Sequence, residues 1–320
     1  MSRYLARSIK GLVCIEWSDE TARNALLTEE IRDADRLVEN VSALGLSLPE
    51  HVTEAVSLLQ QVARQDVEEQ VDGTFKIAAG TASGRVISVS DPEARHGRKS
   101  SSKVINGFKL HIMGTLTSQF VTGIDVTDAA THDAAPTTKL IKDAMRHGLQ
   151  PDAVVGDAAY GSGANHRACN AMGVELHTKL PARSRKDVIY KDQFEINLDT
   201  MEVTCPNGAK TGDFRMGKDP SGSGETVPHF RFDKEDCQQC PHRERCSKAV
   251  IKRGFRTIAL SPFEPELQKA KAFNESAEAP AVLRSRSAVE RLLSHLVRMG
   301  MGHARFFGMC ATQFQAYMVG

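Results

Sequence analysis

The segment that most restricts the fold of this chain runs from residue 152 to residue 181. Its first part, DAVVGDAAYG, is a short apolar run that ends in an aspartate and a glycine-rich bend, which predicts a buried strand and a turn. The next part, GANHRACNAMG, has a helical pattern that ends at Gly173, and VELHTKLP predicts a second strand. This succession predicts an α/β core with parallel strands and places Asp157 at the carboxyl end of a strand.

The sequence before this segment changes from a helical to a strand pattern. Between residues 19 and 70, apolar residues recur at three- and four-residue steps and predict two helices in an acidic hairpin. From residue 85 onward, RVISVSD predicts a strand, and GFKLHIMGTLTSQFVTGIDVT predicts a hairpin that turns near Thr117. Residues 134–147 are again helical in pattern. These elements extend the α/β interpretation.

The net charge of +1 conceals an uneven distribution. Residues 1–70 carry 7 Lys and Arg against 13 Asp and Glu, so the other residues carry 34 against 27. A basic remainder is compatible with a nucleic-acid partner. No apolar run approaches the length of a membrane span, and the first residues do not form a secretory signal. We therefore expect a cytoplasmic protein without a membrane partner.

Four of the seven cysteines fall in the polar stretch 182–262, whose short strand patterns predict a small β-rich insertion. Zinc takes four soft ligands in a tetrahedron, and a C-x2-C pair supplies two of them. The candidate zinc ligands are Cys205, Cys237, Cys240 and Cys246. His242 is an alternative ligand, and ordinary reduced cysteines are the other interpretation. Because the insertion has few large apolar residues, we expect a structural zinc to stabilise it.

A second group of candidate residues is basic. Residues 90–112, SDPEARHGRKSSSKVINGFKLHI, combine positive side chains with three serines, and these residue types bind phosphate backbones. The candidate DNA contacts are Arg95, Arg98, Lys99, Lys103 and Lys109. A solvated loop is the alternative, because runs of charge usually face water.

The third group joins distant parts of the chain. Arg286 and Glu290 are four residues apart on a predicted helix and therefore share a face. A divalent metal with oxygen ligands needs carboxylates from separate elements, so Asp157 and Glu290 are candidate ligands. The alternative is that the two carboxylates are unrelated and that Arg286 and Glu290 form a surface salt bridge.

Several segments, taken in order, resemble a known family. They are SVSDPEARHGRKSSSKVINGFKLHI, VVGDAAYGSG, CPNG with CQQCPHRERC, and SAVERLLSHLVRMGMGHARFFG. They resemble the DDE transposases of bacterial insertion sequences, in particular those with a four-cysteine insertion before the glutamate helix. The resemblance extends from about Tyr4 to Val319. It implies a ribonuclease-H-like fold, a mixed sheet flanked by helices, in which two aspartates and a glutamate hold two Mg²⁺ ions for DNA strand cleavage and transfer.

The resemblance also implies roles for single residues. Asp157 would be the second catalytic aspartate, Glu290 the catalytic glutamate, and Arg286 a contact to DNA phosphate. The partner would be double-stranded DNA, at transposon ends and at the target, in a bacterial nucleoid, and a homo-oligomer is possible in such a family. The extended family signature is only partly met, because Leu283 and Val297 stand where related transposases have tyrosine and lysine.

In the resembled family an Asp-Ser-Thr segment carries the first catalytic aspartate, and this segment does not occur in the sequence. We therefore expect an N-terminally truncated, catalytically impaired transposase that lacks this aspartate and the N-terminal DNA-binding region. In one alternative, Asp91 or a separate polypeptide supplies the missing carboxylate. In another, the chain is a non-catalytic, zinc-stapled DNA-binding remnant. Asp91 would otherwise support the turn before the basic segment, since Asp-Pro favours turns.

These predictions combine into an expected domain organisation. Residues 1–84 would be an acidic helical insertion segment, and residues 85–181 the first part of a ribonuclease-H-like core. Residues 182–262 would form the cysteine-containing, zinc-binding insertion. Residues 263–320 would supply the C-terminal helices of the core, with Glu290.

Overall fold

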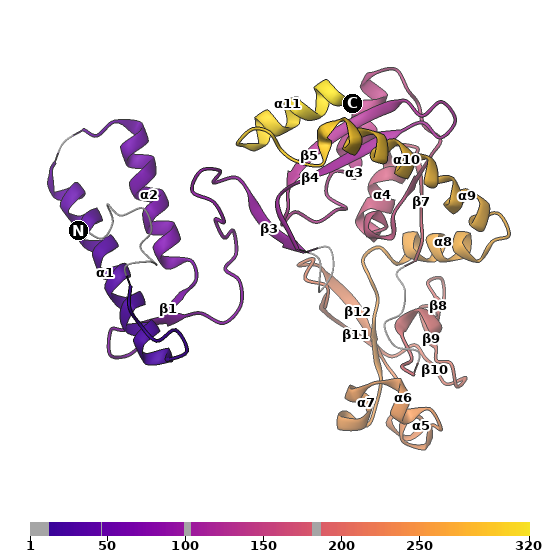
Figure 1. The fold of residues 1–320 in the computed structure, drawn as a ribbon. Coiled ribbons are helices and arrows are strands. Elements are labelled where there is room, and N and C mark those ends of the chain that lie inside the picture. Colours follow the sequence, from indigo (N-terminus) through magenta and orange to yellow (C-terminus); the bar gives the residue numbers. More distant parts are fainter. Residues whose placement is uncertain (1–12, 46, 99–103, 181–186) are drawn as a thin grey trace. The chain divides into compact units, whose positions relative to one another are not determined.

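The structure is a computed structural model that describes residues 13–45, 47–98, 104–180 and 187–320. Its helices and strands are drawn in Figure 1. The chain divides into two compact units. The first comprises Met1–His111, Asp125–Thr131 and Arg298–Gly320, and the second comprises Ile112–Ile124 and His132–Val297. Among the helices that the structure describes, none is long and apolar enough to cross a membrane.

The first unit contains the helical hairpin that the sequence predicts. Its elements are α1 (Glu20–Ala43), α2 (Glu50–Arg64) and two antiparallel strands, β1 (Val67–Glu69) and β2 (Phe75–Ile77). The Asp19 side chain accepts a hydrogen bond from Thr21 N (2.8 Å) and so caps the start of α1.

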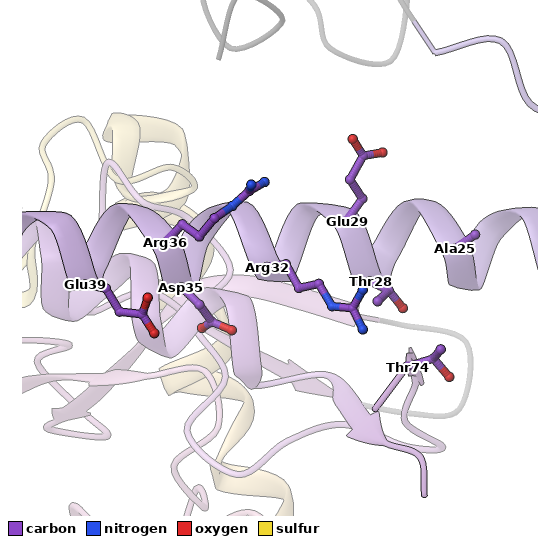
Figure 2. Close-up of a pocket in the computed structure, with 8 residues that line it drawn as sticks. All are labelled: Ala25, Thr28, Glu29, Arg32, Asp35, Arg36, Glu39 and Thr74. Carbon is purple, nitrogen blue, oxygen red and sulfur yellow. The ribbon is translucent and has the colours of Figure 1, made fainter. Parts of the chain in front are cut away.

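Polar contacts tie β2 and the turn before it to α1. Thr28 Oγ1 accepts a hydrogen bond from Phe75 N (2.9 Å), and both residues are buried. Figure 2 shows Thr28 and Arg32 on the side of α1 that points toward Thr74, with Glu29 on the opposite side. The helix therefore holds the strand pair through one polar face.

The first unit also contains most of a three-stranded sheet with the order β3-β4-β5. The strands are β3 (Arg95–Arg98), β4 (Val104–Gly114) and β5 (Val121–Asp128). β3 runs antiparallel to β4, with His96 opposite Asn106. The chain turns between β4 and β5 at residues that include Thr117, as the sequence predicts.

The prediction of a strand at residues 85–91 is wrong, because a side chain takes the backbone hydrogen bonds that a neighbouring strand would need. Gln65 Nε2 donates to the Val86 carbonyl (2.9 Å), and Gln65 Oε1 accepts from Val86 N (2.8 Å). The strand lies instead at β3, within the segment for which a solvated loop was one interpretation. Gly97 permits this placement, since a Cβ at that position would overlap the carbonyl of Ala129.

The C-terminal helix α11 (Met309–Val319) belongs to the first unit and follows the irregular π-turn η4 (Val297–Met301). It is attached through polar side chains: Gln313 Oε1 accepts from Val126 N (2.7 Å), and Gln315 is only 6% exposed. Its aromatic side chains face outward, with Phe314 62% exposed.

The second unit contains the predicted strand–helix–strand segment. β6 (Ala153–Gly156) runs parallel to β7 (Glu175–Thr178), and α4 (Gly163–Ala171) connects them. The core of this region consists of Ile141, Cys169, Val174 and Leu176. The other helices are α3 (Thr137–Arg146), α8 (Glu264–Glu275), α9 (Ala279–Ser285) and α10 (Ser287–Leu296). α4, α8 and α9 pack against β7 (Figure 1).

The cysteine-containing region has a larger core than the sequence predicts. One sheet consists of β8 (Glu195–Asn197), β9 (Glu202–Thr204) and β10 (Lys210–Thr211), and a second of β11 (Phe214–Lys218), β12 (Thr226–Arg231) and β13 (Thr257–Ala259). Its helices are α5 (Lys234–Gln239), α6 (Arg243–Cys246) and α7 (Lys248–Arg253), and a short turn, η3 (Lys191–Gln193), precedes β8. Seven buried apolar side chains form the core: Ile189, Phe194, Val203, Phe230, Phe232, Ile258 and Leu260. This region is therefore stabilised by apolar burial independently of any metal.

The fold class is mixed α/β, and this arrangement is compatible with the ribonuclease-H-like expectation. The parallel pair β6–β7 and the sheet β3-β4-β5 are separate among the described residues. The structure therefore shows the expected kinds of strand and helix, but as small sheets rather than one continuous mixed sheet.

Candidate functional site

Asp157 lies where the sequence predicts it, directly after β6 and before the turn η2 (Ala158–Tyr160). Ser162 Oγ accepts a hydrogen bond from Asn165 N (3.1 Å) at the start of α4. The Asn165 amide in turn donates to the Tyr160 carbonyl (3.0 Å). The bend that follows Asp157 is thus tied to the helix after it.

Gly161 allows this bend to approach β7. A Cβ at Gly161 would overlap the hydroxyl oxygen of Thr178 and lie 3.0 Å from its Cβ. Thr178 is only 2% exposed, so it has little room to move aside.

We expect Gly161→Ala to lower the free energy of unfolding by roughly 1–3 kcal/mol, the usual cost of overpacking. Urea denaturation followed by circular dichroism measures this change. Gly212→Ala is the matched control, because a Cβ there would lie 3.6 Å from its nearest neighbour, and we expect a change below about 0.5 kcal/mol. Equal losses in the two variants would contradict the role of close approach at Gly161.

Asp157, Arg286 and Glu290 meet in the second unit. Arg286 Nη1 lies 2.6 Å from Asp157 Oδ1, and Arg286 Nη2 lies 2.8 Å from Glu290 Oε1. The side chains of both carboxylates are 59% exposed, and that of Arg286 is 30% exposed. One guanidinium group therefore brings together two carboxylates that are far apart in the sequence.

The chemistry of this cluster suits a divalent cation. Carboxylate oxygens are the ligands that Mg²⁺ prefers, and the two carboxylates carry more negative charge than Arg286 neutralises. Exposed ion pairs contribute only up to about 1 kcal/mol each, so a cation is able to replace the guanidinium. The donor atoms thus fit Mg²⁺, although among the described residues no group of three or more His, Cys, Asp or Glu is placed to hold a metal.

Tyr160 is a titratable residue close to Asp157 that the sequence analysis did not single out. Burial, with added repulsion from Asp133 and Asp157, raises the pKa of Tyr160 to about 12. The Tyr160 hydroxyl is protonated at neutral pH, as an ordinary tyrosine is, and the raised pKa extends this to higher pH. Tyr160 was detectable from the stretch that it shares with Asp157.

Three of the predicted basic residues, Arg95, Arg98 and Lys109, lie on strands of the first unit, whereas Arg286 belongs to the second. Arg95 donates to the carbonyls of Pro92 and Ala94, and Lys109 Nζ donates to the Thr131 carbonyl (2.8 Å). Arg98 is exposed at the end of β3. The predicted contacts Lys99 and Lys103 lie outside the described residues.

Asp91 is engaged by the C-terminal helix. Asp91 is only 8% exposed, and its Oδ2 accepts a hydrogen bond from Gly308 N (3.2 Å). Glu93 Oε2 accepts from Met309 N (2.6 Å). Two carboxylates at the N-terminus of α11 stabilise it through its unpaired backbone N–H groups. These contacts support the structural interpretation of Asp91.

The four candidate zinc ligands converge. Cys205, Cys237, Cys240 and Cys246 line one cavity of about 30 Å³, about the space of a single small ion or water. Burial raises the pKa of the Cys237 and Cys246 thiols, and the other thiols of the group add to the shift. His242 is not among the lining residues. The thiols thus face one space, but within the described chain they do not form a closed metal-binding group.

The comparison with protein families gives one match that bears on this site. A family model described as "Transposase DDE domain" matches residues 71–319, which include Asp91, Asp157, Arg286 and Glu290. No curated protein and no solved structure matches the chain in the corresponding comparisons.

Proposed function

Because this chain belongs to the family of transposase DDE domains, we propose that it is an insertion-sequence transposase that cleaves and transfers DNA strands with Mg²⁺. One observation carries the proposal: Asp157, at the end of β6, and Glu290, on α10, meet at a single guanidinium group. Open α/β sheets place ligands at the carboxyl ends of strands, and Asp157 occupies such an end.

In this proposal Asp157 is the second catalytic aspartate and Glu290 the catalytic glutamate, and together they hold Mg²⁺. Bound Mg²⁺ supplies charge that activates the attacking oxygen and stabilises the leaving oxygen. Arg286, once it is released from the carboxylates, contacts a DNA phosphate, for which its planar donors are well suited.

We propose further DNA contacts in the first unit. Arg95, Arg98, Lys99, Lys103 and Lys109 are the proposed contacts to double-stranded DNA. Of those that the structure describes, Arg98 is exposed, while Arg95 and Lys109 are half-buried and donate to backbone carbonyls. These proposed contacts rest on the positive charge of the side chains and, for the described residues, on their positions in β3 and β4. The proposed site of action is the bacterial nucleoid, and the proposed acting form is a homo-oligomer on paired ends.

The proposal includes impaired catalysis by this chain alone. An Asp-Ser-Thr segment does not occur in its sequence, and Arg286 brings together two carboxylates rather than three. Affinity for a hard cation falls with ligand number and charge. We therefore propose a weak, two-carboxylate metal site and impaired catalysis by this chain alone, in a chain organised in the four segments expected from the sequence. Asp91 is the weaker candidate for a third ligand, because it already binds the start of α11.

In a second candidate function, the chain is a non-catalytic DNA-binding remnant of a transposase that a structural zinc ion stabilises. The cavity shared by the four cysteines favours it. In this candidate Asp157 and Glu290 have no remaining catalytic role, and the chain keeps only its affinity for DNA.

Strand transfer from a pre-cut transposon end distinguishes the two functions. The full chain is incubated with labelled end duplex, target plasmid and Mn²⁺, which tolerates incomplete ligand sets better than Mg²⁺, whose coordination demands are strict. Joined products above background would support a transposase. Duplex binding without joined products would support the remnant, and the absence of both would contradict both functions.

A further inference from the structure

Two neighbouring aromatic residues of the first unit are unusually exposed. Phe306 and Phe307, in the segment His-Ala-Arg-Phe-Phe before α11, are 56% and 73% exposed. Exposure of neighbouring phenylalanine rings to water is unfavourable in free energy, and exposed apolar patches are typical of ligand-binding or partner-binding surfaces.

The backbone that carries these rings is held in place. Gln315 Nε2 donates to the carbonyls of Gly300 (3.3 Å) and His303 (3.0 Å), and Gln315 Oε1 accepts from Arg305 N (2.9 Å). At the other end, the side chain of Asp91 accepts from Gly308 N. The rings therefore project from a fixed segment, which reduces the entropy lost when they bind a ligand.

The surroundings of the rings carry positive charge. Phe306, Phe307, His303 and Arg305 line a cavity of about 580 Å³ whose other wall includes β4. Arg305 is exposed, and among the described residues no carboxylate is close enough to pair with it. The lining holds two cations, Lys109 and Arg305, against one carboxylate, Asp91, so its formal charge is positive.

We propose that Phe306 and Phe307 form a stacking surface for unpaired bases of single-stranded or locally opened DNA, and that Arg305 binds an adjacent phosphate. Every base has a flat face that stacks on an aromatic ring, and every nucleotide brings an anion. Bases of an intact duplex are stacked on each other, so this surface selects unpaired ones. The inference rests on the proposed action on DNA and adds a subsite to it.

The test uses the full chain and a short single-stranded oligonucleotide that contains a fluorescent adenine analogue. Binding should quench the analogue, because its ring stacks on phenylalanine. Phe306→Ala and Phe307→Ala should each lower the affinity about 5- to 100-fold and reduce the quenching. Phe314→Ala is the matched control, since Phe314 is 62% exposed on α11 but does not line the cavity, and its affinity should stay unchanged.

Two further variants separate stacking from other causes. Phe307→Leu keeps an apolar side chain without a ring and should behave like Phe307→Ala, whereas Phe307→Tyr should bind like the natural chain. Arg305→Gln should lower the slope of log affinity against log salt by about one, and the phenylalanine variants should leave this slope unchanged.

Several outcomes would overturn the inference. The first is unchanged affinity in the alanine variants, and the second is full affinity in Phe307→Leu. The third is a concentration-dependent dimer, seen by sedimentation, that the alanine variants abolish, which would assign the surface to a second copy of the chain. Duplex binding without single-strand binding would refute this inference alone. Binding of neither DNA would refute the proposed function as well.

Discussion

Asp157→Asn should lower the affinity of the chain for Mn²⁺ by about 10- to 100-fold or more. Loss of even an outer partner of a metal ligand costs that much, and Asp157 is proposed as a direct ligand. The substitution keeps the size of the side chain and removes its charge. Glu290→Gln should have the same effect, because both carboxylates meet at Arg286. Electron paramagnetic resonance of free Mn²⁺ measures the binding without any DNA.

Two further variants serve as controls for this experiment. Asp199→Asn removes an exposed carboxylate of the second unit away from the cluster and should leave Mn²⁺ binding unchanged. Arg286→Gln removes the cation that competes for the same oxygens and should raise the affinity about 2- to 5-fold, since an exposed ion pair is worth up to about 1 kcal/mol. A loss of affinity in Arg286→Gln would show that Arg286 positions the carboxylates instead of occupying the place of the metal.

Cys237→Ser should reduce the zinc content of the purified chain from about one ion per molecule to nearly none. Cys237 and the three other thiols line one cavity, and a thiolate is a far better zinc ligand than a hydroxyl. Elemental analysis after gel filtration gives the stoichiometry. Metal-free natural protein with this region folded would contradict the zinc proposal.

The same variant should lower stability without unfolding the whole cysteine-containing region. That region has its own apolar core, which includes Phe230 and Phe232, and it is bound to α8 by the ion pair Lys191–Glu264 (2.6 Å). Thermal unfolding should therefore shift to a lower temperature but stay cooperative. Cys14→Ser is the matched control, because Cys14 is exposed and lies outside the insertion; its zinc content and its stability should match those of the natural chain.

Some predictions failed because backbone groups found partners far along the chain. The apolar alternation at residues 85–91 is that of a strand, yet Gln65 takes both hydrogen bonds of Val86. β3 formed in a charged segment, because β4 supplied its partners and Gly97 fits against Ala129. Strand formation depends on the neighbour more than on the strand's own residues.

Asp91 is a candidate site residue whose role likewise depends on a contact with a distant part of the chain. Its position after an apolar run is that of a catalytic aspartate or of a turn, and its local sequence is equally compatible with either. The contact with Gly308 N, at the start of a helix more than two hundred residues later, supports the structural role. No periodicity or motif contains that information, because it depends on where the C-terminal helix packs.

Local pattern was sufficient for the strand–turn–helix–strand segment, for the helical hairpin, and for Asp157 at a strand end, since each depends on residues within a few positions of one another. The family was also recognisable from the order of its motifs. Which side chains meet was settled by folding: Arg286 joins Asp157 to Glu290, Gln315 holds the segment that carries Phe306 and Phe307, and four cysteines line one cavity. The contact of Arg286 with Asp157 and the convergence of the four cysteines join distant segments, and their geometry follows from packing of the whole chain.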